Sequence, residues 1–408
     1  MLDEAFVESL DASLRADDEE RARRYPGGSL RRQPVHTCYV PADVFDAATP
    51  GAWGAAALAA LDEHGPLPGF EGDHRIDELV RAKLAREPIE DVRIDFEDGY
   101  GVRPDDEEDA AVRSAAAALR AMVDDRSAPP FSGFRMKCLE GPVRRRALRT
   151  LQLFLEAFVD GAGSRALPPG FRVTLPKVTS VAQVEVMVRL CAALEQAHGI
   201  DRLPFEIQVE TPQAILGPEG TALIAPMIHA TEGRLAGLHY GTYDYSASVG
   251  VAAAFQSMEH PAADHAKAVL QLAAAGTGVP VSDGSTNILP VGDRANVRSA
   301  WALHARLVRR SLERAYYQGW DLHPAQLPTR YAATFAFYRE GLAAAGRRLR
   351  VYLDRAASEV MDEPATALAL ASYLVRGLDA GAVSDAEVSA ASGLDRAALD
   401  GLARKPAP

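Results

Sequence analysis

Short apolar segments rich in β-branched residues recur along the middle of the chain, and longer alanine-rich segments carrying Arg and Glu separate them. The strand candidates are residues 35–41, 92–98, 133–138, 171–177, 205–211, 235–244, 278–284 and, weakest, 319–324. The clearest helical segments between them are residues 107–124, 142–160, 181–198 and 294–316. Strands that alternate with such helices indicate a parallel sheet. Eight units predict an α/β fold, the closed (β/α)8 TIM barrel.

Three segments lie outside this alternation. Residues 1–34 predict a charged N-terminal helical extension that ends at the break "YPGGS". The predicted catalytic barrel covers residues 35–325, with an insertion rich in Ala, Gly and Pro at 47–80, and residues 326–408 predict a C-terminal helical region. An open, doubly wound sheet is the alternative, but no GxGxxG follows a strand and no P-loop is present.

Composition narrows the class of protein. The 408 residues are 48% hydrophobic and 25% charged, which is ordinary for a globular protein. A net charge of −12 argues against general binding of nucleic acid or anionic membranes, although a local basic pocket remains compatible with it. The three cysteines form no CxxC pair, and no apolar run of membrane-spanning length occurs. We therefore expect a cytoplasmic protein with no nucleic-acid or membrane partner.

Polar residues collect where the predicted strands end. In barrels of this kind the chemistry takes place at the carboxyl ends of the strands. Scattered surface charges would not be expected to gather there. The residues at these ends are Glu97, Asp98, Arg135, Lys177, Glu210, Asp244 and Asp283.

Glu210 and Asp244 are the first candidates for a metal site. Glu210 lies at the corner between "FEIQV" and "TPQAIL", and Asp244 ends the next strand candidate. Neighbouring strands lie about 4.8 Å apart, so two carboxylates at one level can share a cation. Mg²⁺ is typically held by one or two carboxylates together with water and substrate oxygens. Each acid could instead cap the helix that follows it, but their occurrence on consecutive strands favours a metal.

Two basic strand-end residues have alternative interpretations. Arg135 matches a substrate carboxylate, or pairs with Glu97 or Asp98 in "RIDFEDGYG", and both can hold together. Lys177 in "TLPKV" could form a Schiff base with a 2-oxo acid, but pairing with nearby carboxylates is the favoured interpretation. Asp321 and His323 in "GWDLHP" could form a hydrogen-bonded pair.

Six motifs in order resemble a known family. They are "VRIDFEDGYG", "GFRMKC", "TLPKVTS", "QVETPQAI", "GLHYGTYDYSASVG" and "YYQGWDLHPAQL". This order resembles the citrate lyase β-subunit-like group of the HpcH/HpaI aldolase and malate synthase superfamily, over roughly residues 35–330. Each motif alone is weak, and the specificity lies in the six together.

The resemblance implies roles for particular residues. Glu210 and Asp244 fall on the family's Mg²⁺ ligands, and Arg135 on the arginine that binds the substrate carboxylate. Glu97 and Asp98 fall on the acidic pair that lines the site and holds water or the arginine.

The segment "SEVMDEPATA" resembles the family's motif that follows the barrel. It implies Asp362 as an acid/base that commonly reaches the site of a neighbouring subunit. A homo-oligomer is therefore expected, a trimer or hexamer as in relatives.

Met136 and Lys137 depart from the usual motif. The additions at 1–34 and 47–80 lie near the first strand and could reshape the region that receives coenzyme A in relatives. Whether coenzyme A is part of the substrate is left open.

The expected function is reversible carbon–carbon cleavage by a Mg²⁺-dependent lyase or aldolase, with Mn²⁺ as the other candidate ion. The substrate would be a 2-oxo acid or a 3-hydroxy acid, free or as its CoA thioester, and the reaction would pass through a metal-bound enolate. Three alternatives stay open: a malate-synthase-like condensing enzyme, a Schiff-base aldolase that uses Lys177, and a barrel that binds a metabolite without turnover.

Overall fold

Eight short parallel strands form the centre of this computed structural model, which describes residues 2–29, 31–160, 167–354 and 363–403. They are β1 (His36–Pro41), β2 (Asp91–Asp95), β3 (Phe131–Arg135), β4 (Phe171–Leu175), β5 (Phe205–Val209), β6 (Leu235–Tyr240), β7 (Val281–Ser282) and β8 (Gly319–Asp321). They pair in the order β7-β6-β5-β4-β3-β2-β1-β8. The Asp283 amide donates to the Gln318 carbonyl at 2.8 Å, and the Trp320 amide donates to the Gly284 carbonyl at 3.1 Å. These bonds join the two ends of the sheet, so the predicted (β/α)8 barrel is confirmed.

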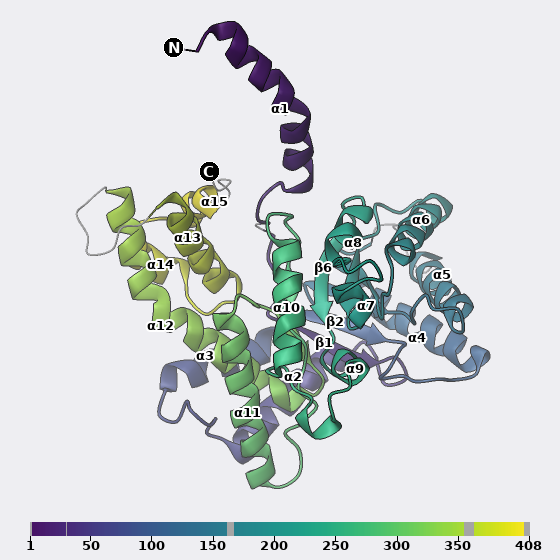
Figure 1. Cartoon of the computed structure of the whole chain (residues 1–408). Helices are drawn as coiled ribbons and strands as arrows, with labels where there is room; N and C mark the ends of the chain where they lie inside the picture. The colour runs from purple at the N-terminus through teal and green to yellow at the C-terminus, as the bar shows by residue number, and fades with distance from the viewer. Residues whose placement is uncertain (1, 30, 161–166, 355–362, 404–408) are drawn as a thin grey trace.

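Helices surround the barrel because the outward faces of the strands are apolar (Figure 1). Phe134 on β3, for example, stacks on Phe154 with ring centroids 4.2 Å apart, and both side chains are fully buried. The helices that follow β1 to β7 are α2 (Thr49–His64), α3 (His74–Arg86), α4 (Asp105–Asp124), α5 (Arg144–Asp160), α6 (Val181–His198), α7 (Pro212–Ile215), α8 (Ile224–Ala230), α9 (Thr242–Ser248), the short 3-10 turn η1 (Ala253–Phe255), α10 (Pro261–Ala274) and α11 (Arg294–Glu313).

The segment 47–80 contains helix α2 and half of helix α3. Its apolar residues face the barrel: Leu61, Ile76 and Val80 are at most 2% exposed and belong to the main core. The alanine-rich composition of this segment therefore supports helices that pack closely on each other and on α12.

The C-terminal region begins with the 3-10 turn η2 (Pro324–Gln326) and the long helix α12 (Leu327–Leu353). The first half of α12 packs on the barrel through Tyr331 and Phe335. Its second half joins α13 (Pro364–Asp379), α14 (Asp385–Ser392) and α15 (Arg396–Ala403) in a separate core around Leu349, Leu374 and Leu399. Because α12 contributes to both cores, the domain boundary at residues 325 and 326 stays a prediction.

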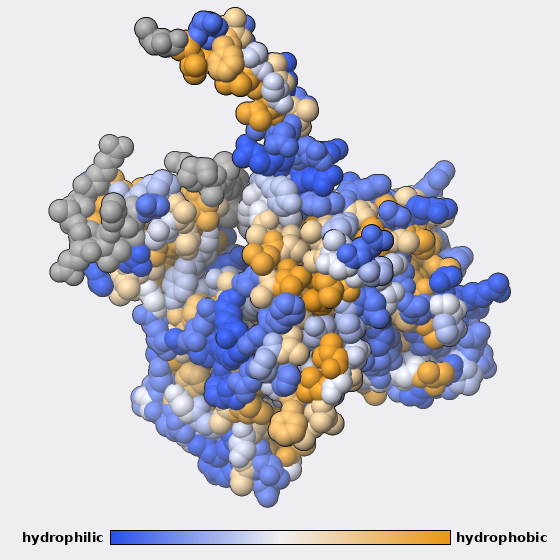
Figure 2. All heavy atoms as spheres, in the orientation of Figure 1, coloured by the Kyte–Doolittle hydropathy of each residue, from blue (hydrophilic) through white to orange (hydrophobic). Residues whose placement is uncertain are grey.

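Helix α1 (Glu4–Arg24) projects from the body and has no buried residue. Figure 1 shows it standing free of the other helices. Phe6, Leu10 and Leu14 follow one another at four-residue intervals and are 48%, 44% and 57% exposed, and Figure 2 shows apolar atoms along this helix. None of the described helices is both long enough and apolar enough to cross a bilayer.

The interior of the barrel is charged near its middle. The Arg93 guanidinium lies 2.8 Å from Asp91 and 3.0 Å from Glu206, and all three side chains are fully buried. Gly133 leaves room for this arginine, since a Cβ there would lie 2.7 Å from Arg93 Nη1. His239 extends the network to Glu206 at 3.2 Å. Branched apolar side chains usually fill this position in such barrels.

Candidate active site

A cavity of about 450 Å³ opens at the carboxyl ends of the strands. Its walls come from the ends of β1, β2, β3, β5, β6 and β8 and from the loops that follow them. The lining residues are Tyr39, Pro41, Asp95, Asp98, Gly99, Arg135, Gln208, Glu210, Gly241, Thr242, Tyr243, Asp244, Ser285, Trp320 and Leu322. Four of the residues predicted from sequence, Asp98, Arg135, Glu210 and Asp244, therefore share one cavity.

Asp95 holds Arg135 in the wall of this cavity. Arg135 Nε and Nη2 donate to the two Asp95 carboxylate oxygens at 2.7 and 2.6 Å. The guanidinium lies over the Tyr39 ring, 4.8 Å from its centroid. The third nitrogen, Nη1, lies 3.2 Å from Glu97 and 3.4 Å from Gln208. A bidentate pair of this kind fixes the plane of the guanidinium. Because Nε and Nη2 are used by Asp95, Nη1 is the nitrogen that can donate a hydrogen bond to a substrate.

Lys177 lies among the acids at the neighbouring strand ends. Its Nζ donates to Glu97 and lies 2.8 Å from Asp98 and 3.1 Å from Asp244. Its backbone has a φ of 51°, in the left-handed region, and its N–H donates to Glu210 Oε1 at 2.9 Å. A lysine rarely adopts this conformation, and such strain is concentrated at functional sites.

Lys177 is a protonated ammonium in this setting. Burial lowers its pKa, but the carboxylates of Glu210 and Glu97 and the hydrogen bonds to Asp98 and Glu97 more than offset burial, so the pKa lies above its ordinary value. Lys177 therefore pairs with nearby carboxylates, as the favoured interpretation of the sequence predicted. A Schiff-base lysine needs the free amine, which this environment disfavours.

Two carboxyl groups beside Lys177 have a raised pKa, mainly because they are buried. Burial raises the pKa of Glu210 to about 8, although Lys177 opposes this, and Glu97 and Asp244 raise it further. Burial also raises the pKa of Glu97 to about 7, against the effects of Arg135 and Lys177. For Asp98, the two cations outweigh burial and lower the pKa. The two cations, Lys177 and Arg135, are therefore too few to neutralise all the acids at this place.

The donor set fits a divalent cation. Glu210 directly follows β5, and Asp244 lies in the first turn of α9, four residues beyond the end of β6. Gly241 permits the close approach of this turn, since a Cβ there would lie 2.5 Å from Glu210 Cβ. The donors are all carboxylate oxygens, which Mg²⁺ prefers. Asp244 already pairs with one cation, the Lys177 ammonium.

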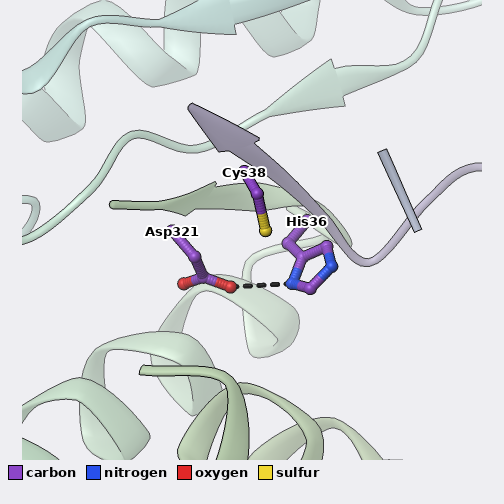
Figure 3. A group of neighbouring side chains, drawn as sticks. All are labelled: His36, Cys38 and Asp321. Atoms are coloured by element: carbon purple, nitrogen blue, oxygen red, sulfur yellow. Dashed lines mark hydrogen bonds and ion pairs between the residues drawn. The ribbon is translucent and has the colours of Figure 1, made fainter. Parts of the chain in front are cut away.

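A second group of possible metal ligands comes from β1 and β8 (Figure 3). Ligand atoms of His36, Cys38 and Asp321 lie within 4.8 Å of one another. His36 Nε2 accepts the Glu90 N–H at 3.1 Å, so Nδ1 carries the proton and donates to Asp321 at 2.8 Å. Arg330 donates to the same carboxylate at 3.0 and 3.1 Å. A guanidinium already neutralises this acid, so the group is a structural ion pair.

Replacing Arg330 with methionine is expected to lower the free energy of unfolding by about 3 kcal/mol, because Asp321 would remain buried without its cation. Urea unfolding followed by circular dichroism measures this. Arg306→Met, which removes the exposed pair with Glu259, is the control and should cost less than about 1 kcal/mol. Equal costs for the two variants would show that Arg330 contributes packing alone.

Other sequence predictions have different outcomes. Asp283 lies away from the cavity lining and pairs with Lys267 at 3.0 Å and Ser311 at 2.7 Å, as a buried structural acid. The predicted Asp321–His323 pair is wrong, because His323 Nδ1 accepts the N–H of Ala325 at the start of η2. Asp362 lies outside the described residues, so its role as acid/base stays a prediction.

Several lining residues were given no role from the sequence. Asp95 could have been found, because it and Arg135 end consecutive strands and are direct neighbours in the β2–β3 register. The Tyr39 and Trp320 rings, 4.6 Å apart, carry no comparable signal in the sequence. Tyr243 donates to Asn287 Oδ1 at 2.9 Å and accepts its N–H at 2.7 Å, which fixes the loop after β7.

Comparison with known proteins gives a family and a fold. A family model described as a domain of unknown function, DUF6986, matches residues 14–407. No curated protein matches the sequence. A crystal structure of a citrate lyase from Burkholderia xenovorans LB400 is 19% identical and has a TM-score of 0.60, covering 88% of this chain and 95% of that chain. The magnesium and glyoxylate complex of Haloferax volcanii malate synthase is 14% identical with a TM-score of 0.51, covering 92% and 99%. The resemblance found from the sequence motifs is confirmed at the level of the fold.

Proposed function

This chain belongs to the DUF6986 family, and from the geometry of its cavity we propose that it is a Mg²⁺-dependent carbon–carbon lyase. The substrate would be a 2-oxo acid or a 3-hydroxy acid. One observation carries the proposal: the Lys177 ammonium pairs with Glu97, Asp98 and Asp244, its backbone N–H donates to a fourth carboxylate, Glu210, and an arginine that Asp95 holds in place lies beside them. A barrel that only needed stability would not require this group of strained and desolvated residues.

Each residue has a part in the proposed reaction. Glu210 and Asp244 would hold Mg²⁺, or Mn²⁺, and the bound ion would supply Lewis acidity at the substrate carbonyl. Arg135 would orient the substrate carboxylate through Nη1 and so lower the entropic cost of reaching the reactive geometry. Glu97, whose pKa is about 7, can accept or donate a proton near neutral pH, with Asp98 beside it. Asp362 remains the proposed acid/base from beyond the barrel.

Analogy supports the ligand class. Haloferax volcanii malate synthase, which shares the fold, is described in complex with magnesium and glyoxylate, which is a 2-oxo acid. The carboxylates suit a divalent cation, and the arginine that Asp95 holds in place suits the carboxylate of an oxo acid. A malate-synthase-like condensing reaction uses them too, so the lyase and the condensing enzyme differ in the second substrate. Coenzyme A as part of the substrate, a trimeric or hexameric assembly and a cytoplasmic location all stay predictions.

Removing the Lys177 ammonium tests the metal site. Lys177→Met is expected to bind Mg²⁺ about tenfold more tightly than the wild type, because the competing cation is gone from Asp244 and the acids repel one another without it. Calorimetric titration of Mg²⁺, with and without pyruvate, oxaloacetate or glyoxylate, measures this. The wild type should bind an oxo acid only when Mg²⁺ is present. Lys177→Arg keeps the charge and is the matched control, expected to bind Mg²⁺ like the wild type.

Borohydride trapping and turnover assays, added to the titration, separate the alternatives. Borohydride trapping of an oxo acid on Lys177 in the presence of EDTA would replace the metal mechanism with the Schiff-base aldolase. Absence of Mg²⁺ binding in both the wild type and Lys177→Met would leave Glu210 and Asp244 as helix caps. Metal-dependent binding of an oxo acid without turnover of any acyl-CoA or hydroxy acid would favour the metabolite-binding barrel.

A further inference from the structure

The amino ends of the barrel strands open into a second and larger cavity, of about 740 Å³. It lies at the opposite end of the barrel from the candidate active site, because its lining includes Phe131 at the start of β3, Phe171 at the start of β4 and Pro204 just before β5. Residues 28, 29 and 31–33 and helix α13 complete its walls. Its size lies in the range of small-molecule sites.

Five arginines line this cavity in a chain whose net charge is −12: Arg31, Arg32, Arg172, Arg202 and Arg376. Two of them are neutralised. Arg172 pairs with Glu206 at 3.1 Å, and Arg32 pairs with Glu90 at 2.9 Å and Glu87 at 3.2 Å. Arg172 and Arg32 therefore have structural roles, because binding a ligand would break these ion pairs.

The other three arginines have no carboxylate partner within 4.0 Å among the described residues. Arg376 donates to the Gln33 side-chain oxygen at 3.0 Å and lies over the Tyr317 ring, 4.3 Å from its centroid. Arg202 donates to the Glu232 carbonyl, and Arg31 is exposed beside the cavity. Asp201 is the acidic residue in the lining. Three guanidiniums against one carboxylate leave the cavity positively charged.

The rest of the lining combines the polar side chains of Ser29, Gln33 and Ser372 with apolar, partly aromatic ones. Phe131 and Phe171 stand at one side, and Pro168, Pro204 and Pro280 line the cavity with them. Guanidinium groups match phosphate oxygens with two parallel hydrogen bonds, and an apolar wall suits the organic part of the same ligand. A ligand with several phosphates and one flat apolar group satisfies both halves of the cavity.

We propose that this cavity binds an organic polyphosphate of the nucleoside di- or triphosphate class, with the phosphates on Arg31, Arg202 and Arg376. The site lies at the other end of the barrel from Glu210 and Asp244 and needs no metal at those residues. Binding is therefore independent of the proposed lyase reaction, and the failure of one proposal leaves the other standing.

The test is calorimetric titration of the full chain with ATP in EDTA, which removes divalent metal. The wild type is expected to bind ATP, and Arg202→Met and Arg376→Met are each expected to lower the affinity about tenfold. Arg202 is exposed and its side chain contacts one backbone carbonyl, so this variant should keep the wild-type melting temperature. Arg306→Met is the control. Arg306 is exposed, pairs with Glu259 and is not part of the cavity lining, so this variant should bind ATP like the wild type.

Salt dependence and comparison with smaller ligands test the phosphate contacts and the apolar wall separately. Affinity for ATP should fall between 50 and 200 mM salt, as the phosphate contacts require, and adenosine alone should bind weakly. Pyrophosphate binding as tightly as ATP would overturn the role of the apolar wall. No ATP binding by the wild type, or equal binding by wild type and both arginine variants, would overturn the site itself.

Discussion

Glu210→Gln is expected to abolish detectable Mg²⁺ binding and to lower kcat/KM for the substrate by at least about 10³-fold, or about 4 kcal/mol. Glutamine keeps the size of the side chain and removes the charge. Glu210 is buried and accepts hydrogen bonds from the Lys177 N–H and the Gln208 side chain, so the substitution should leave the fold intact. Calorimetry of Mg²⁺ binding and an assay of carbon–carbon cleavage measure the two effects.

Glu219→Gln is the matched control for this variant. Glu219 lies in the loop between α7 and α8 and is exposed, so the same chemical change is made without touching the cavity. It should bind Mg²⁺ and turn over substrate like the wild type. If Glu210→Gln bound the metal as tightly as Glu219→Gln, the acid at the end of β5 would be no ligand and the proposed function would lose its basis.

Arg135→Met is expected to lower kcat/KM by about 10³-fold while Mg²⁺ binding persists, because the substrate carboxylate loses its charged partner. The pattern of the loss is informative. Without Arg135, the Asp95 carboxylate and Glu97 stay buried without their guanidinium, so the free energy of unfolding should also fall by about 3 kcal/mol. Steady-state kinetics and urea unfolding measure the two quantities separately.

Asp95→Asn tests the orientation of Arg135 separately from its charge. It keeps Arg135 but weakens its bidentate support, so the arginine would be less well oriented. We expect a smaller loss than in Arg135→Met, about 10²-fold, with most of it in KM. Wild-type kinetics in both variants would mean that Arg135 is held only for stability.

The fold was predictable because periodicity is a local property. All eight strand candidates are strands, in the order that a barrel requires. The end was placed too far along in seven of the eight, as at Asp98, Lys177 and Thr211, because the β-like composition continues past the point where the chain leaves the sheet. β7 is only Val281–Ser282, since Gly278 and Pro280 precede it and leave few residues free to pair.

The candidate site was predictable only in part, because its contacts depend on geometry between distant segments. Strand-end position alone indicates Glu210, Asp244 and Arg135. That Lys177 places its ammonium among the acids depends on a left-handed φ at one residue, and no periodicity encodes this. Asp283 shows the converse, because a strand-end acid that looked like the others turns away to Lys267.

The charged centre of the barrel has a consequence for how this sequence can change over evolutionary time. Arg93 is buried and pairs with both Asp91 and Glu206, so losing Arg93 leaves Asp91 without its paired cation, and losing either acid removes one of the two carboxylates that neutralise Arg93. Their substitution effects should be strongly non-additive, with single changes harmful and a concerted change to apolar residues tolerated. Sequences descended from a common ancestor with this chain should therefore keep the three together or have replaced them together.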